Sequence, residues 1–97
     1  MKIRWSPTAV SDLVSIRDYI AQDSPSAARK VANRIKESVN RLTGFPLSGR
    51  VGRVLGTREL VIPGTSYIVY IVAYTLQSEE VQIAAVLHGR QNWPESL

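Results

Sequence analysis

The side chains able to perform acid–base or phosphate chemistry are few, and most lie in the second half of the chain. His88 is the single histidine, and the chain has no cysteine, which excludes thiolate catalysis and cysteine-ligated metal sites. Arg58, Tyr67 and Arg90 could act beside His88 as charge stabilisers or proton donors if the fold brought them together. A lone histidine at a strand end is more commonly a hydrogen-bonded structural residue, so both interpretations stay open.

Residues 44–56 contain four glycines together with Arg50 and Arg53, and Arg58 follows before any acidic residue of this half of the chain. Guanidinium groups bind phosphate or carboxylate through two hydrogen bonds, so this segment is a candidate surface for an anionic partner. The alternative, that these arginines are only solvated, is equally open. A Walker-type nucleotide loop is excluded because no Gly-Lys-Ser/Thr tripeptide leads into a helix.

The composition indicates one globular domain over residues 1–97, with 44% hydrophobic and 21% charged residues and a net charge of +4. No apolar run approaches the ~20 residues that span a bilayer. Residues 1–5 lack the apolar segment of a signal peptide. We therefore expect a cytoplasmic protein without membrane association. We expect no metal and no cofactor, because no acidic cluster has the spacing of metal ligands.

Two helices are predicted in the first half of the chain. Ser6-Pro7 and Ser24-Pro25 are helix starts, because a serine oxygen caps free amide groups and proline fits the first helical position. Apolar residues spaced three and four apart then predict helices over 7–22 and 25–43. The short link between them predicts an antiparallel hairpin. The second helix has a basic outer face, which is either solvated surface or a partner site: Arg29, Lys30, Arg34, Lys36 and Arg41, with one acid, Glu37.

Strands are predicted around and after the helices. Residues 2–5 alternate polar and apolar side chains, and residues 57–62, 67–74 and 81–87 are rich in strand-forming residues, with a turn at Pro63-Gly64. Short links make the last three strands antiparallel neighbours. His88 continues the alternation of Ala84 and Val86, so we expect all three on one face. The predicted fold is α+β: an N-terminal strand, an antiparallel two-helix hairpin and a three-stranded antiparallel sheet that the N-terminal strand joins, with the helices packed on one face.

Several short strings, in this order and in a chain of this length, resemble the RelE/ParE superfamily of toxins from bacterial type II toxin–antitoxin systems. The resemblance covers nearly the whole chain and is carried by Trp5-Ser6-Pro7, Asp18-Tyr19-Ile20, Thr57-Arg58-Glu59-Leu60, Tyr67-Ile68-Val69-Tyr70 and Val86-Leu87-His88-Gly89-Arg90. RelE-like members cut messenger RNA in the ribosomal A site without a metal, whereas ParE-like members poison DNA gyrase.

Two positions favour ParE over RelE. The ribonuclease members place an arginine immediately before the core of the central strand, and this chain has Tyr67 there. RelE proper also carries two basic residues on the preceding strand; Arg58 fits the first position and Leu60 departs from the second. The resemblance thus implies a toxin that inhibits DNA gyrase by binding and is neutralised by a cognate antitoxin. The predicted target-binding residues are Arg50, Arg53, Arg58, His88, Arg90 and Trp93.

Two alternatives remain. The chain could be a ribosome-dependent mRNA endoribonuclease, in which case the resemblance assigns catalysis to Arg58, Tyr67, His88 and Arg90. It could also be a degenerate toxin whose only partner is its antitoxin.

Overall fold

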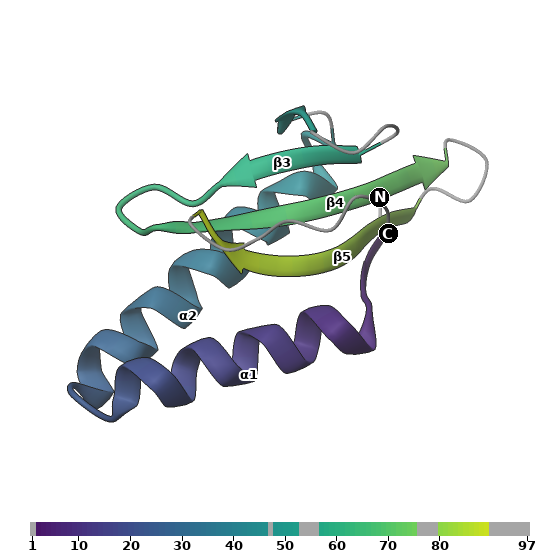
Figure 1. The fold of residues 1–97 in the computed structure, drawn as a ribbon. Coiled ribbons are helices and arrows are strands. Elements are labelled where there is room, and N and C mark those ends of the chain that lie inside the picture. Colours follow the sequence, from purple (N-terminus) through teal and green to yellow (C-terminus); the bar gives the residue numbers. More distant parts are fainter. Residues whose placement is uncertain (1, 47, 53–56, 76–79, 90–97) are drawn as a thin grey trace.

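The computed structural model describes residues 2–46, 48–52, 57–75 and 80–89, and the backbone alone for residues 68–75. The elements follow the chain in the order β1 (Lys2–Trp5), α1 (Pro7–Ala21), α2 (Pro25–Asn40), a 3₁₀ turn (Arg41–Thr43), β2 (Arg50–Val51), β3 (Thr57–Val61), β4 (Tyr67–Thr75) and β5 (Glu80–His88). The α+β class is confirmed. Both helices lie on the same side of the sheet and run antiparallel to each other (Figure 1).

The sheet has five strands in the order β1-β5-β4-β3-β2. The predicted antiparallel arrangement of the last three strands is confirmed, and the N-terminal strand joins the sheet as expected, but the prediction missed β2. Strands β2 to β5 pair antiparallel, but β1 adds parallel to β5, with Lys2 opposite Glu80 and Trp5 opposite Ile83. This pairing brings together residues from opposite ends of the chain, so no local sequence pattern predicts it. Strand β2 has only two residues, which is too short for a period-2 pattern.

Both helix starts are confirmed by their caps. Ser6 Oγ accepts a hydrogen bond from the Ala9 amide at 3.0 Å, and Ser24 Oγ accepts one from the Ala27 amide at 3.2 Å. Helix α1 ends at Ala21, one residue before its predicted end. Helix α2 ends at Asn40, and its predicted last residues tighten into the 3₁₀ turn, as is common at helix ends.

The hydrophobic core lies between the helices and the sheet (Figure 1). Its fully buried members come from both layers: Ala9, Ile35, Val39, Leu42, Ile62, Val81, Ile83 and Val86. Burying each larger aliphatic side chain contributes about 1.5–3 kcal/mol. The apolar stripes of the two helices therefore fix how the hairpin sits on the sheet.

Strand β5 contains a β-bulge that the alternation argument missed. Tyr70 pairs with Ala85 but the next residue, Ile71, pairs with Ile83, so Ala84 is the extra residue. The bulge interrupts the alternation of buried and exposed side chains along β5. As a result, the core residues Ile83 and Val86 are three positions apart instead of two. The expectation that Ala84, Val86 and His88 share a face therefore fails at Ala84.

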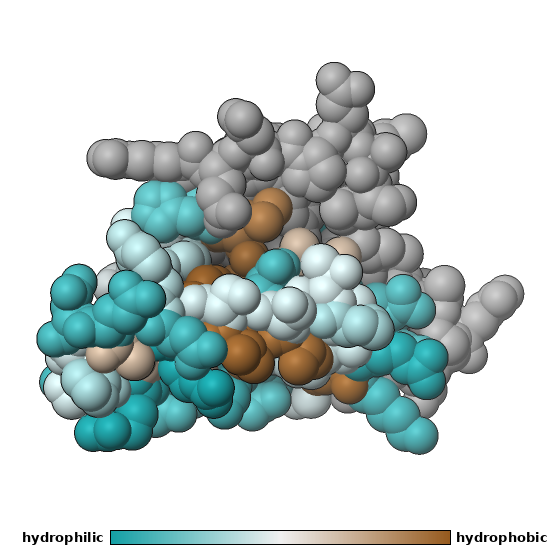
Figure 2. Space-filling model, turned by 60° about the horizontal axis from the view of Figure 1, so that its bottom comes forward, coloured by the Kyte–Doolittle hydropathy of each residue, from teal (hydrophilic) through white to brown (hydrophobic). Residues whose placement is uncertain are grey.

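The outer surface of the helical layer is mostly hydrophilic. Figure 2 shows teal side chains around this face with hydrophobic ones gathered along its middle. Val10 and Val14, one turn apart on α1, are among the exposed large hydrophobic residues. Among the residues that the structure describes, no helix combines the length and the apolar character that crossing a membrane requires.

Candidate functional site

Arg50, a predicted target-binding residue, holds the short strand β2 on β3. Its Nε and Nη2 atoms both donate to Glu59 Oε1, at 3.3 and 3.0 Å. The Glu59 side chain is 1% exposed, whereas that of Arg50 is 56% exposed. A buried carboxylate needs such a partner, because an unpaired buried charge is strongly destabilising. Arg50 thus pairs with an interior charge while more than half of its side chain is exposed to solvent.

Arg58 has a similar internal role on the neighbouring strand. Its Nη1 atom donates to the carbonyl of Gly49 at 2.8 Å, which ties the loop before β2 to β3. The loop approaches β3 closely: a Cβ atom at position 49 would lie 2.9 Å from the Glu59 carbonyl oxygen. At Gly52 a Cβ atom would overlap Thr57 Oγ1, while the Gly52 amide donates to the Thr57 carbonyl at 2.9 Å. These two glycines are therefore required by packing.

Tyr67 and His88 meet where the first residue of β4 pairs with the last residue of β5. Their ring centroids are 5.4 Å apart and the rings are almost perpendicular, at 88°. Burial, and secondarily the neighbouring Tyr19, raises the pKa of Tyr67 above its ordinary value of 10.0. The phenol therefore stays protonated at neutral pH, where it can donate a hydrogen bond but is a poor base.

The structure divides the predicted residues into two places on the sheet. Arg58 pairs with Ile71, which lies four positions along β4 from Tyr67. The backbone of Arg58 is therefore displaced from the Tyr67–His88 pair by about 13 Å along the strand direction. The guanidinium group of Arg58 is directed to Gly49, next to β2, and β2 is on the opposite side of β3 from β4 and β5. Tyr67 and His88 are thus brought together, but Arg58 is not brought to them.

Three of the predicted residues, Arg53, Arg90 and Trp93, lie outside the described residues. Their roles in catalysis or target binding stay predictions. Among the residues that the structure describes, no group of three or more histidine, aspartate and glutamate side chains is arranged to hold a metal ion.

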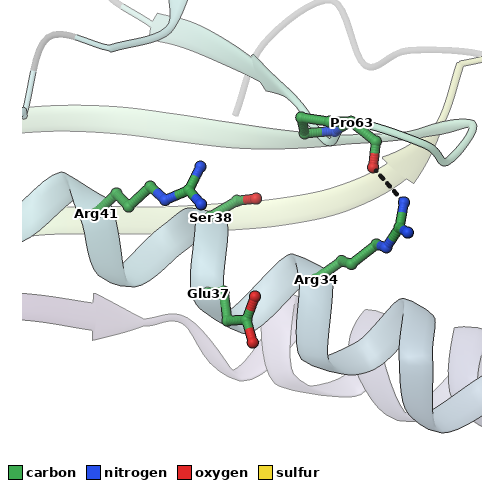
Figure 3. Close-up of a pocket in the computed structure, with 5 residues that line it drawn as sticks. All are labelled: Arg34, Glu37, Ser38, Arg41 and Pro63. Atoms are coloured by element: carbon green, nitrogen blue, oxygen red, sulfur yellow. Dashed lines mark hydrogen bonds between the residues drawn. The ribbon is translucent and has the colours of Figure 1, made fainter.

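A groove beside α2 is a candidate site that the sequence did not predict, because only one of its two walls follows from a local pattern. One cavity in it, of about 220 Å³, is lined by Arg34, Glu37, Ser38 and Arg41 from the helical layer and by Pro63 from the turn after β3 (Figure 3). The basic helical face was visible in the sequence as a surface of undecided role. Its second wall comes from a turn 29 residues further along the chain, as the Arg34–Pro63 hydrogen bond shows, and no local pattern predicts that contact.

Comparisons with known proteins agree on one family. Residues 3–93 match the family described as "ParE toxin of type II toxin-antitoxin system, parDE". The protein Y4kP of Sinorhizobium fredii is 43% identical over 96 residues, covering 99% of this chain and 96% of that protein. Toxin RelE2 of Caulobacter vibrioides is 32% identical over 88 residues, covering 91% and 94% of the two chains.

A solved structure supports the same assignment. The chromosomal ParDE toxin–antitoxin system from P. aeruginosa contains a chain that superposes with a TM-score of 0.77. The two chains are 26% identical, and the similarity covers 91% of this chain and 95% of the other.

Proposed function

The chain belongs to the ParE toxin family of type II toxin–antitoxin systems, and from that premise we propose that it inhibits DNA gyrase by binding it and is neutralised by a cognate antitoxin. The proposal concerns the target and the mode of action, because membership of the superfamily is compatible with more than one mechanism. Binding requires a complementary surface and no reacting groups. We propose that Arg50, Arg53, Arg58, His88, Arg90 and Trp93 contribute to that surface.

The observation that carries this proposal is the identity of the residue beside His88. A tyrosine with a raised pKa occupies the first position of β4, where the resemblance places an arginine in ribonuclease members. Phosphodiester cleavage develops negative charge that needs a fixed cation, and removing one such donor commonly costs about 10²–10³ in rate. Arg58 lies at another part of the sheet, bonded to Gly49, which further supports binding over catalysis.

One observation favours the runner-up, a ribosome-dependent mRNA endoribonuclease. His88 and Tyr67 are in ring contact, and both side chains are partly exposed. A neutral phenol and an imidazole at one site can move a proton to a leaving group. This pair is therefore the place where the two mechanisms make different predictions.

Measuring growth inhibition by variants of the chain in cells distinguishes the gyrase mechanism from the ribonuclease mechanism. Under the gyrase proposal, His88→Ala should leave growth inhibition nearly intact, because it removes one contact from a broad surface. Replacing Arg50 and Arg53 together by Ala should weaken inhibition. Because Arg50 also pairs with Glu59, the fold of that variant must first be verified by circular dichroism. Loss of toxicity in His88→Ala with retained folding would favour the ribonuclease. Retained antitoxin binding by a parent chain that never inhibits growth would indicate a degenerate toxin.

A further inference from the structure

The exposed surface of α2 carries five basic side chains that the proposed gyrase surface does not use. They are Arg29, Lys30, Arg34, Lys36 and, directly after the helix, Arg41. The helix contains one acidic residue, Glu37. Among the residues that the structure describes, no ion pair joins any of the five cations to a carboxylate. Their charge is therefore available to an anionic partner.

The five cations form two rows along the helix. At 3.6 residues per turn, Arg29 and Lys36 lie within about 20° of each other around the helix axis. Lys30, Arg34 and Arg41 form the second row, about 100–140° around the axis from Arg29. At 1.5 Å per residue, the rows extend over about 10 and 17 Å of a helix about 24 Å long. The exposed surface of α2 is thus bordered by positive charge on both sides.

The strip between the two rows is polar. Its residues are all described and all exposed: Ser26, Asn33, Glu37 and Asn40. The apolar side chains of the helix are buried in the core instead. Figure 3 shows the same division, with Arg34 and Arg41 on the margin nearer the sheet and Glu37 pointing away from it. A partner of this strip therefore meets hydrogen-bonding groups rather than an apolar floor.

This polar strip excludes several kinds of anionic partner. A membrane-surface helix inserts apolar side chains into the lipid boundary, and an amphipathic peptide needs an apolar groove. Single-stranded nucleic acid is held by aromatic side chains on which its bases stack. The strip carries neither aliphatic nor aromatic side chains. What remains is a partner recognised by its charge and its shape.

Duplex DNA has that charge and that shape. A helix about 10–12 Å in diameter fits the major groove of B-form DNA, which is about 12 Å wide. Phosphates border this groove on both sides, so one row of cations can reach each strand. Asparagine and glutamate side chains between the rows would face the base edges, with which both residue types form hydrogen bonds. The deep, narrow major groove of an RNA duplex is closed to side chains.

We propose that α2 is a binding surface for double-stranded DNA, with its two cationic rows on the phosphates that border the major groove. This activity goes beyond gyrase inhibition and does not depend on it, because the chain alone would bind DNA. The affinity comes mainly from neutralising phosphates, so it falls steeply as the salt concentration rises. If the chain also binds gyrase, the DNA that gyrase holds becomes a second contact for the same molecule.

The test uses double variants of the full chain that remove two charges each. Arg29→Gln/Lys36→Gln removes the first row. Lys30→Gln/Arg41→Gln removes two charges of the second row and leaves Arg34 in place. Glutamine is a good helix former, and all these positions are exposed, so the fold should be retained. Circular dichroism of each variant checks this.

The charge-matched control is Lys2→Gln/Arg4→Gln in β1. Ile3 and Trp5 pack against the core, so the alternation of the strand places Lys2 and Arg4 on the face of the sheet away from the helices. Arg4 forms an ion pair with Glu80 at 3.7 Å, but its side chain is 68% exposed, so losing this pair should hardly affect stability.

The probe is a fluorescently labelled DNA duplex of about two helical turns, or about 20 base pairs, and mixed sequence. Fluorescence anisotropy measures its binding at a series of salt concentrations. Four or five phosphate contacts predict that log K falls against log salt with a slope of about −3.6 to −4.5. Each α2 variant should make the slope shallower by about 1.8, since two contacts are lost. The control should change it by less than about 0.5.

Other outcomes would overturn the proposal. No binding of the duplex at low salt would refute it, as would equal changes of slope in the control and the α2 variants, which would indicate general attraction to a basic protein. A change in only one of the two α2 variants would contradict the two-row geometry. Single-stranded DNA, an RNA duplex and polyglutamate are the competitors, and stronger binding of any of them than of the DNA duplex would assign this face to another partner. Each of these results would leave the gyrase proposal standing, because gyrase inhibition is measured separately.

Discussion

At the scale of single residues, the pairing with Glu59 gives Arg50 a role in the stability of the fold. The carboxylate is almost fully buried, and both hydrogen bonds from Arg50 reach the same oxygen atom. Removing a hydrogen-bonded, charged partner from such a group costs about 1–3 kcal/mol. The arginine was predicted from sequence as a contact for a target, and its pairing with Glu59 adds a structural role that no local pattern indicates.

Arg50→Ala should therefore lower the free energy of unfolding by about 1–3 kcal/mol, since Glu59 would stay buried without this cation. Arg29→Ala, on the exposed surface of α2, is the control and should change stability by less than about 0.5 kcal/mol. Urea denaturation of the two variants measures the difference. Equal stability of both would show that Glu59 does not depend on Arg50.

Tyr67 gives a prediction for high pH. Because burial raises its pKa in the folded protein above 10.0, its contribution to stability is fully present below about pH 10. That contribution is lost as the pH rises through the folded pKa. Ultraviolet titration should show a tyrosine ionisation at higher pH than that of a free tyrosine, and Tyr67→Phe should remove that late step. A late step that persists in the variant would assign it to another tyrosine.

At the scale of elements, α1 is attached to the β-bulge of β5. Ser6 caps the helix, donates from Oγ to the Ala84 carbonyl at 2.9 Å, and donates from its amide to the Ile83 carbonyl at 2.9 Å. Six residues later, Asp12 Oδ2 accepts from the Val86 amide at 3.0 Å. These bonds use backbone groups at the bulge, where the regular ladder is interrupted.

Asp12→Ala should destabilise the protein by about 1–3 kcal/mol, because the Val86 amide would lose its acceptor. The Val86 amide should also exchange with solvent faster than its neighbours in the variant. Asp12→Asn keeps an oxygen acceptor and should lose much less stability. If Asn and Ala behaved alike, the hydrogen bond would not be the source of the effect.

The elements that could be predicted from sequence are those with local signals. Ser6-Pro7 and Ser24-Pro25 predicted both helix starts, and the apolar run of 67–74 predicted β4 almost to its ends. The features that the sequence did not reveal depend on distant contacts: the parallel direction in which β1 pairs with β5, the bulge at Ala84 and the two-residue β2. The same limit applies to the candidate sites. Tyr67 and His88, both singled out from the sequence, are in ring contact, but the partners of Arg50 and Arg58 and the wall of the groove come from tertiary packing.

At the scale of the whole molecule, a net charge of +4 is distributed over surfaces with different roles. One basic set lines the α2 groove, and another, around β2 and β3, is partly used to hold the sheet edge. Both attract acidic partners, so a toxin of this kind should associate with its antitoxin faster at low salt.

The central claim, that toxicity arises from gyrase binding, is tested most directly by measuring DNA supercoiling by purified gyrase in the presence of the purified chain. The same preparation is added in parallel to translating ribosomes, and the messenger RNA is examined for cleavage. The account predicts inhibition of supercoiling that His88→Ala retains, with the messenger RNA intact. Unimpaired supercoiling together with cleavage at A-site codons that His88→Ala abolishes would contradict it.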